Sequence, residues 1–287
     1  MTDAIVRKKI REMLVEDLGS GDVTSETLVH RETKARASVI AKQSGILAGV
    51  AEAAIVFKEM RVRVKVLKPD GARVRAGSVI MRLDGPARGI LAAERVALNL
   101  LMRMSGIATA TRELIDRARR RNPKVVIAAT RKTAPLLTHF DKRAVKVAGG
   151  KPHRYRLSDH ILIKDNHIRL VGAIVEAVRH SRKIKRVKVE VEVNKPADAL
   201  KAARAGADVV MLDNMNPTDI VRTIKMLKRE GLRDKIVLEA SGRIDTSNVG
   251  DFAATGVDMI SSSYMTMRAP ALDMSLEVLG KGFKSAS

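Results

Sequence analysis

Six short apolar runs, mostly separated by helical stretches, constrain the fold of the chain after residue 123. The runs are VVIAA (125–129), ILI (161–163), VKVEVEV (187–193), DVVMLD (208–213), KIVLEA (235–240) and VDMIS (257–261). The expected helices between them cover 170–181, 196–205, 217–230 and 246–255. Such alternation predicts parallel strands joined by right-handed crossovers. Six strands in series favour an α/β barrel over an open sheet.

Polar residues lie within or directly after each run. In chain order they are Thr130, Arg131 and Lys132; Lys164; Glu190 and Glu192; Asp213 and Asn214; Glu239, Ser241 and Gly242; and Ser261, Ser262 and Ser263. The carboxyl ends of barrel strands converge on one mouth, where late Ser/Gly loops often bind phosphate through backbone N–H groups. Central carboxylates would suit ribose hydroxyls or Mg²⁺. The pattern predicts a site for an anionic, phosphate-bearing substrate.

The stretch 130–168 concentrates basic side chains between two of these strands. They are Arg131, Lys132, His153, Arg154, Lys164 and His167. Cations grouped at strand ends are suited to a substrate with several negative charges. The alternative is a solvated basic loop, since Lys and Arg occur throughout the chain.

The first part of the chain has a different pattern. A helix is expected over 3–18, followed by a turn, and 35–90 resembles a series of strands with Gly and Pro-Asp-Gly turns. A helical stretch over 92–120 carries Arg95 on its polar side, and Gly106 is a possible break in it. The β-rich stretch is interpreted as structural.

Composition excludes several functional classes. The chain has no cysteine, which excludes disulfides and thiolate chemistry. No run approaches the ~20 apolar residues of a membrane span, and the N-terminus lacks the apolar core of a signal peptide, so a cytoplasmic location is expected. The net charge is 54 − 32 = +22, which invites a nucleic-acid hypothesis. With aromatics at 2%, no Trp and dispersed basic residues, that hypothesis is disfavoured.

Several motifs together resemble the quinolinate phosphoribosyltransferase family, the carboxylating nicotinate-nucleotide pyrophosphorylases. They are EDLGSGDVTSETL, ERVALNLLMRMSGIATAT, TRKTAP, HRYRLSD, LIKDNH, VEVEV, VVMLDNM, LEASGRI and VDMISSS. The resemblance covers nearly the whole chain, and TRKT with HR and LIKDNH at this spacing is specific.

The resemblance implies an incomplete α/β (TIM-like) barrel with a β-rich α+β N-terminal sandwich domain. The domains would be 1–110, joined by the C-terminal tail 269–287, and 111–268. It also implies a homodimer or an assembly of dimers with shared active sites. The implied reaction converts quinolinate and phosphoribosyl pyrophosphate to nicotinate mononucleotide, pyrophosphate and CO₂, with Mg²⁺ as cofactor.

The resemblance also implies residue roles. Arg131, His153, Arg154 and Lys164 would hold the quinolinate carboxylates, and Arg95 would join them from the neighbouring subunit. Thr130 would also be substrate-binding, and Lys132 would lie near the pyrophosphate. Glu192 and Asp213 would contact the ribose and the metal, which is held mainly through substrate phosphates. The 5′-phosphate would lie among Ser241, Gly242, Ser262 and Ser263.

Some positions depart from the family's usual pattern, and other functions stay open. Lys151 and Pro152 interrupt a glycine-rich run, Arg156 replaces a usual Gly, and Ser263 and Met267 replace a usual Gly and His. These changes leave room for a different pyridine acid or a paralogue without activity. A Schiff-base lyase that uses Lys164 as its nucleophile is a further alternative.

Overall fold

The computed structural model describes residues 3–279 and divides into two units. Within the described residues, the first unit contains the chain up to Thr109, His139–Ala148, and the chain from Ala269 onward. The second contains Ala110–Thr138 and Gly149–Arg268. This division differs from the expected one in the segment His139–Ala148, which groups with the first unit. Residues 280–287 of the expected tail lie outside the described residues.

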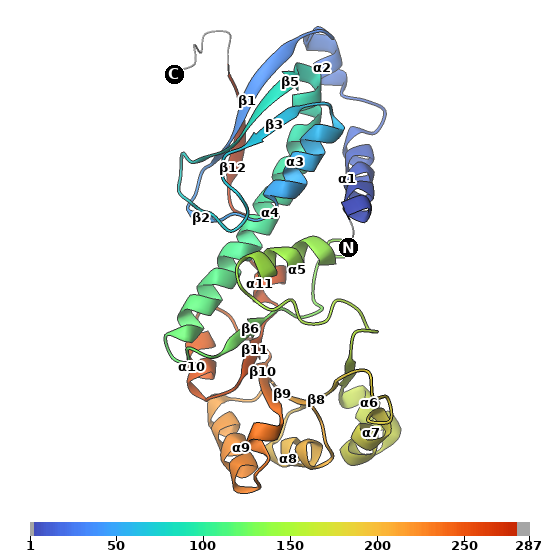
Figure 1. The fold of residues 1–287 in the computed structure, drawn as a ribbon, viewed down its shortest axis with the longest axis vertical. Coiled ribbons are helices and arrows are strands. Elements are labelled where there is room, and N and C mark those ends of the chain that lie inside the picture. Colours follow the sequence, from blue (N-terminus) through green and yellow to red (C-terminus); the bar gives the residue numbers. More distant parts are fainter. Residues whose placement is uncertain (1–2, 280–287) are drawn as a thin grey trace. The chain divides into compact units, whose positions relative to one another are not determined.

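The first unit contains a four-stranded antiparallel sheet in the order β12-β1-β5-β3. The strands are β1 (Lys34–Ala41), β3 (Arg63–Val66), β5 (Val79–Pro86) and β12 (Met274–Leu279). Strand β12, from the far end of the chain, lies beside β1 (Figure 1). A small second sheet pairs β2 (Gly45–Ile46) with β4 (Arg73–Val74). The expected β-rich N-terminal unit is therefore present.

The helices of this unit were only partly predictable. Besides α4 (Ala87–Arg119), they are α1 (Asp3–Leu18), α2 (Val23–Leu28), α3 (Val50–Glu59) and α5 (Thr138–Val147), of which α5 begins one residue before the unit boundary. Helix α1 matches its expected range, whereas α2 replaces an expected turn. Helix α3 interrupts the expected β-rich stretch, and its Val56 and Phe57 are buried in the core. Helix α5 lies within the expected basic stretch, and its buried Asp141 accepts two 2.8 Å hydrogen bonds from Arg103.

Helix α4 (Ala87–Arg119) is continuous, so the possible break at Gly106 was wrong. A Cβ at this position would lie 2.1 Å from the Pro270 carbonyl oxygen. Glycine here therefore lets the chain after Arg268 pass against the helix, and helical hydrogen bonding continues through it. None of the helices within residues 3–279 is long and apolar enough to cross a membrane.

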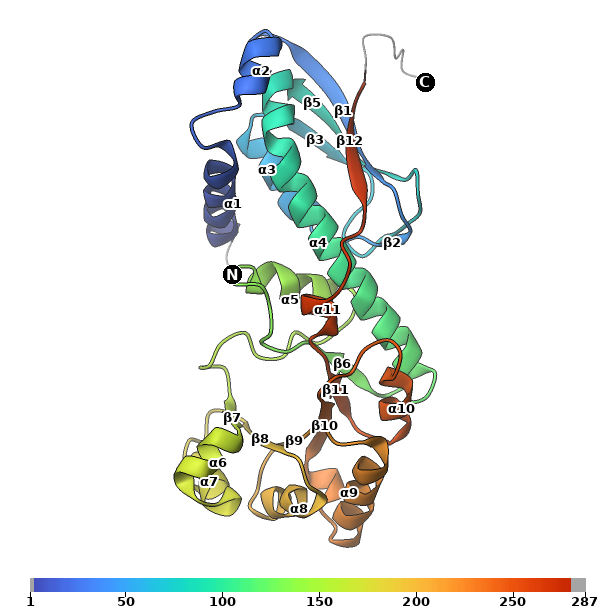
Figure 2. The same ribbon diagram turned by 180° about the vertical axis from the view of Figure 1, so that it is seen from behind.

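The second unit contains a six-stranded parallel sheet in the order β6-β11-β10-β9-β8-β7, drawn as an arc in Figure 2. The strands are β6 (Val126–Ala128), β7 (Ile161–Ile163), β8 (Val189–Val193), β9 (Val209–Asp213), β10 (Val237–Ser241) and β11 (Met259–Ser261). Between them lie α6 (Asp165–Val171), α7 (Ile174–Ser181), α8 (Pro196–Arg204), α9 (Pro217–Arg229), the 3₁₀ turn Arg233–Lys235, and α10 (Val249–Ala254); α11 (Tyr264–Met267) follows β11. Strands β6 and β7 form the two edges of this sheet, which confirms the incomplete α/β barrel. Lys151 forms one parallel bridge with Ala128 at the β6 edge.

The strand register separates an apolar face from a polar face. On one face Val191, Val210 and Leu238 are fully buried, and α8 packs on β8 and β9. On the other, Glu192 and Glu239 both pair in register with Met211. Because side chains alternate along a strand, the expected mouth residues within the strands, among them Asp213, Ser241 and Ser261, share this second face.

Candidate active site

An ion pair joins the ends of two neighbouring strands of the second unit. Lys164 follows β7 and caps α6, and its Nζ contacts Glu192 Oε2 on β8. The backbone N–H of Lys164 also donates to His167 Nδ1 at 3.0 Å. Two of the four residues expected to be catalytic, Lys164 and Glu192, are therefore brought together at the carboxyl ends of β7 and β8; the other two are Lys132 and Asp213.

His153 lies against two carboxylates that are almost fully buried. Its Nε2 is 3.3 Å from Glu239 Oε2 and 3.7 Å from Glu190 Oε2. The backbone of His153 is left-handed, with φ of 55°, a conformation uncommon for residues other than glycine. His160, directly before β7, places its Nε2 2.8 Å from Glu190 Oε2.

Nothing in the sequence singled out His160, and Glu190 and Glu239 were expected only as polar residues at the mouth, without individual roles. The two glutamates were recognisable, because Glu190 precedes Glu192 by two residues and so shares its face of the strand. The histidine gave no comparable signal, because only the folded loop turns its ring toward β8.

Arg154 is buried, and its Nη1 donates to the His160 carbonyl oxygen at 3.3 Å. Burial first, and then repulsion from Arg131, lowers the pKa of Arg154, whereas Glu190 raises it. Two expected substrate-binding arginines thus act electrostatically on each other. Such repulsion favours an anion between them.

The loop after Arg154 is shaped by Asp159. Its Oδ2 accepts from the N–H of Tyr155 at 2.7 Å and of Arg156 at 3.1 Å. These two hydrogen bonds lower the pKa of Asp159. The side chain of Arg156, where the family usually has glycine, is exposed.

The turn after β6 presents two further basic residues. Thr130 Oγ1 accepts from the N–H of Lys132 at 3.0 Å, and Thr266 Oγ1 donates to the Lys132 carbonyl at 2.7 Å. Arg131 and Lys132 both have exposed side chains. Thr130 therefore fixes the turn, while the two cations remain accessible to an anionic ligand.

The loops after β9 and β10 contact each other closely. Asp213 accepts from Asn214 Nδ2 at 2.8 Å, and the Asn214 N–H donates to the Ser241 carbonyl at 2.8 Å. Gly242 has φ of 102°, and a Cβ there would lie 2.5 Å from Asn214 Oδ1. Glycine is therefore required in this loop for both its backbone conformation and its closeness to Asn214.

Ser262, one of the serines expected to bind the 5′-phosphate, is held by hydrogen bonds within the protein. Its buried hydroxyl donates to the Ile244 carbonyl at 2.5 Å and accepts from the Tyr264 N–H at 3.0 Å. Its N–H donates to the Ala128 carbonyl at 3.0 Å, which ties the loop to β6. Ser263 is only partly buried and precedes α11.

Arg95 lies in the first unit, on an exposed part of α4. It is therefore not among the residues that the second unit brings together. Met267, the other residue departing from the family's pattern near the end, is 56% exposed.

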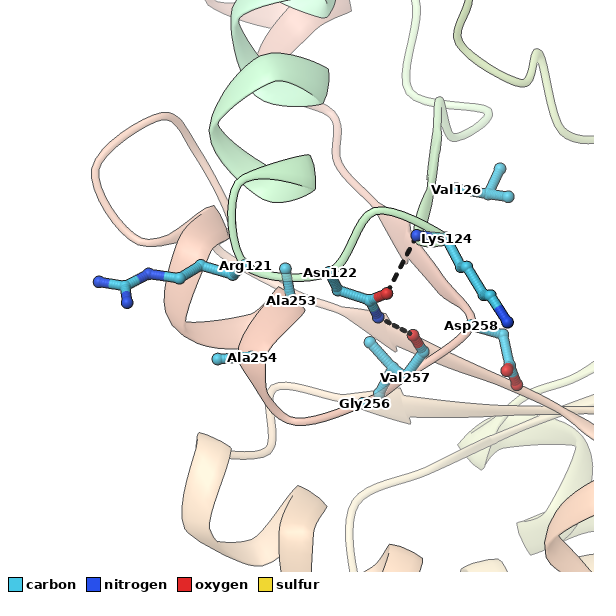
Figure 3. A pocket seen from close by; sticks show the side chains of 9 residues that line it. All are labelled: Arg121, Asn122, Lys124, Val126, Ala253, Ala254, Gly256, Val257 and Asp258. Carbon is cyan, nitrogen blue, oxygen red and sulfur yellow. Dashed lines mark hydrogen bonds between the residues drawn. The ribbon is translucent and has the colours of Figure 1, made fainter.

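A hollow lies at the amino-terminal ends of β6 and β11, opposite the mouth. Figure 3 shows the side chains that line it. The side chain of Asn122 lines the hollow. It accepts a hydrogen bond from the Lys124 N–H at 3.1 Å and donates one to the Val257 carbonyl at 3.3 Å. Much of the remaining lining is alanine, glycine and valine. It contains none of the expected site residues, so the candidate site is the polar mouth.

The fold and site define an α/β barrel enzyme with a basic mouth at the carboxyl ends of its strands. The quinolinate phosphoribosyl transferase N-terminal domain matches residues 22–105, and the C-terminal domain of the same family matches residues 107–277. The chain therefore belongs to the quinolinate phosphoribosyltransferase family, which confirms the resemblance seen in the sequence.

Individual proteins agree with this assignment. A probable nicotinate-nucleotide pyrophosphorylase (carboxylating) from Archaeoglobus fulgidus is 48% identical over 259 residues, covering 90% of this chain and 98% of that protein. One from Methanothermobacter thermautotrophicus is 46% identical over 273 residues, covering 94% and 98%. The solved structure of the nicotinate-nucleotide pyrophosphorylase from Francisella tularensis has a TM-score of 0.90 at 36% identity, covering 97% of this chain and 98% of that one. The expected fold class and enzyme class are confirmed.

Proposed function

We propose that the mouth of the second unit transfers the phosphoribosyl group of phosphoribosyl pyrophosphate to quinolinate. The products are nicotinate mononucleotide, pyrophosphate and CO₂, in the synthesis of NAD. The observation that carries the residue assignment is the convergence of Arg154, His153 and the Lys164–Glu192 pair at neighbouring strand ends. These groups combine cations for an acid with a carboxylate for a developing positive charge.

Quinolinate carries two adjacent carboxylates, which Arg131, His153, Arg154 and Lys164 would hold. Arg154 is buried and fixed by the His160 carbonyl, so it can orient one carboxylate with little loss of side-chain freedom. Lys164 would exchange part of its contact with Glu192 for the second carboxylate. The ion pair favours a charge-holding role for Lys164 over the Schiff-base alternative.

The sugar and its leaving group would lie toward Glu192, Asp213 and Lys132. Carboxylates beside the ribose stabilise the positive charge that builds on it as pyrophosphate departs. The exposed Lys132 ammonium would bind the departing pyrophosphate. Gly242 and the neighbouring backbone of Ser241 and Ser263 would bind the 5′-phosphate, while the Ser262 hydroxyl holds the loop in place.

Mg²⁺ fits this donor set in a limited way. Glu192 and Asp213 offer hard oxygen atoms that are only partly buried, and Mg²⁺ is commonly held by one or two carboxylates plus substrate phosphates. In the described residues, neither carboxylate belongs to a group of three close ligands. When bound through the pyrophosphate, the ion would neutralise charge on the leaving group.

The chemistry needs no organic cofactor. The pyridine nitrogen forms a bond to the anomeric carbon while the bond from that carbon to the pyrophosphate oxygen breaks. The ring becomes a pyridinium, which accepts the electron pair released when the 2-carboxylate leaves as CO₂. A proton then replaces the carboxylate on the ring carbon.

The assembly is part of the same proposal. The enzyme would be a homodimer, or an assembly of dimers, in the cytoplasm, and Arg95 of one subunit would complete the acid pocket of its neighbour. A shared site of this kind makes dimer formation necessary for activity.

Product analysis tests the proposed function. The purified chain is incubated with phosphoribosyl pyrophosphate, Mg²⁺ and either quinolinate or nicotinate, and nicotinate mononucleotide is measured by chromatography. Product from quinolinate is expected. Product from nicotinate alone would show that the acid pocket, where Arg156 is unusual, selects a different pyridine acid, and product from neither would contradict the proposal.

A further inference from the structure

Two histidines and a glutamate converge beside the proposed acid pocket. Among the described residues, His153, His160 and Glu190 form a group of three whose ligand atoms all lie within 4.8 Å of one another. Both histidines turn Nε2 toward Glu190 Oε2, at 3.7 Å and 2.8 Å. The ring centroids of the histidines are 5.3 Å apart.

We propose that His153, His160 and Glu190 bind one Zn²⁺ or a similar divalent transition metal. Tetrahedral zinc has bonds of about 2.0–2.2 Å to imidazole nitrogen and carboxylate oxygen, which separate neighbouring ligand atoms by roughly 3.4 Å. The separations of the two histidine nitrogens from Glu190 Oε2, 3.7 Å and 2.8 Å, lie on either side of this value, and the ligand atoms of the two histidines lie within 4.8 Å of each other, so side-chain rotations would complete the geometry. Imidazole ligands favour such metals over Mg²⁺.

The electrostatics of the cluster support a cation. The Glu190 and Glu239 side chains are 2% and 0% exposed. Within the described residues, Oε1 of each is buried without a hydrogen-bond partner. Leaving buried carboxylate oxygens unsatisfied is costly. Two buried carboxylates carry two negative charges, and Arg154 offsets one of them. A divalent ion bound to Glu190, which lies beside Glu239, would compensate the other.

The metal would also regulate the enzyme. A metal-bound His153 would have its Nε2 occupied, so it could no longer bind a quinolinate carboxylate. This inhibition depends on the proposed function, because it requires His153 in the acid pocket. Metal binding itself does not depend on it.

Calorimetric titration of the metal-free, full-length protein with Zn²⁺, in the absence of substrate, tests the site. The wild type is expected to bind one equivalent with a dissociation constant in about the micromolar range or below. His160→Gln and Glu190→Gln should each weaken binding at least roughly 10-fold. His180→Gln, which changes an exposed histidine of α7, is the matched control. Co²⁺ in place of Zn²⁺ should give the intense visible absorption of a tetrahedral site in the wild type and in His180→Gln.

Two results would overturn the metal site: no stoichiometric binding by the wild type, or unchanged binding by a folded His160→Gln, with folding checked by circular dichroism. Glu190→Gln supplies the same test if His160→Gln does not fold.

The inhibition is tested separately. Turnover of the wild type and of His160→Gln is compared at equal concentrations of Zn²⁺ and substrate, so the amount of metal chelated by substrate is the same in both. Inhibition of the wild type alone is expected, and equal inhibition of both would refute it. If neither protein turns over quinolinate without Zn²⁺, the proposed function fails while the binding result still decides the site.

Discussion

Lys164 and Glu192 form an ion pair across the carboxyl ends of the adjacent parallel strands β7 and β8. The pair sets a cation suited to the acid beside a carboxylate suited to the ribose. Each side chain orients the other, so little reorganisation is needed when substrate charge replaces part of the contact.

Removing single charges at the mouth should abolish most catalysis without unfolding the protein. Lys132→Ala and Glu192→Ala should each lower turnover by at least roughly 10²-fold, as expected for charges positioned around a transition state. Steady-state kinetics, with circular dichroism as the folding check, measures this. Lys124→Ala, at the opposite strand ends, is the control and should be near normal. Near-normal activity in both site variants would contradict the assignment.

Gly242→Ala should raise the KM for phosphoribosyl pyrophosphate by roughly 10-fold or more. The added Cβ would approach Asn214 Oδ1 to 2.5 Å and the Asn214 nitrogen to 2.8 Å, which forces the phosphate loop to move. Gly231→Ala is a matched control, since Gly231 also has positive φ but has nothing within 4 Å of the added Cβ. Similar kinetic effects from both substitutions would show that backbone strain alone is responsible.

Subunit mixing tests the role of Arg95. Arg95→Ala and Lys164→Ala should each be inactive alone. If the two residues serve one site from different subunits, the mixed dimer has one intact site, and random mixing should restore about a quarter of wild-type activity. Activity is measured after joint unfolding and refolding of the two variants. Failure to regain activity, with mixed dimers demonstrated, would count against the shared site.

Asp159 should control the loop that follows Arg154. Its pKa is lowered in the folded state, so its stabilising contribution is present above the unfolded value of about 3.9 and is lost as pH falls through the lower folded value. Amide chemical shifts of Tyr155 and Arg156 should follow that acidic titration. Asp159→Asn should remove the titration and raise the KM for quinolinate several-fold. Asp251→Asn, which changes an exposed residue, is the control for the titration and the KM. A midpoint at or above about 3.9 in the pH titration of the Tyr155 and Arg156 amide shifts would contradict the expectation.

Much of the second unit could be predicted because its periodicity is strong. All six predicted strands are present, with boundaries within two residues, and 196–205 and 217–230 correspond to α8 and α9. The expected helix over 170–181 is instead two helices, α6 and α7, because Gly172, with φ of 96°, ends the first. Convergence of polar strand ends followed from the geometry of parallel strands.

Other features depended on tertiary contacts that the sequence does not show. Helix α5 lies in a stretch rich in basic residues and gave no clear helical pattern, and it is held by the hydrogen bonds of its buried Asp141 with the partly buried Arg103. Gly106 was recognised as a local anomaly but misinterpreted, because the Pro270 segment that needs the space is distant in sequence. The contact of His160 with Glu190 likewise depends on a loop conformation set by Asp159.

Release of labelled CO₂ from carboxyl-labelled quinolinate tests the central claim most directly. The label would be placed on the carboxylate adjacent to the ring nitrogen, and release would be measured with Mg²⁺ in the presence and absence of phosphoribosyl pyrophosphate. The account predicts release only when phosphoribosyl pyrophosphate is present, because decarboxylation requires the pyridinium formed on transfer. Release without it, or no release in its presence, would contradict the account.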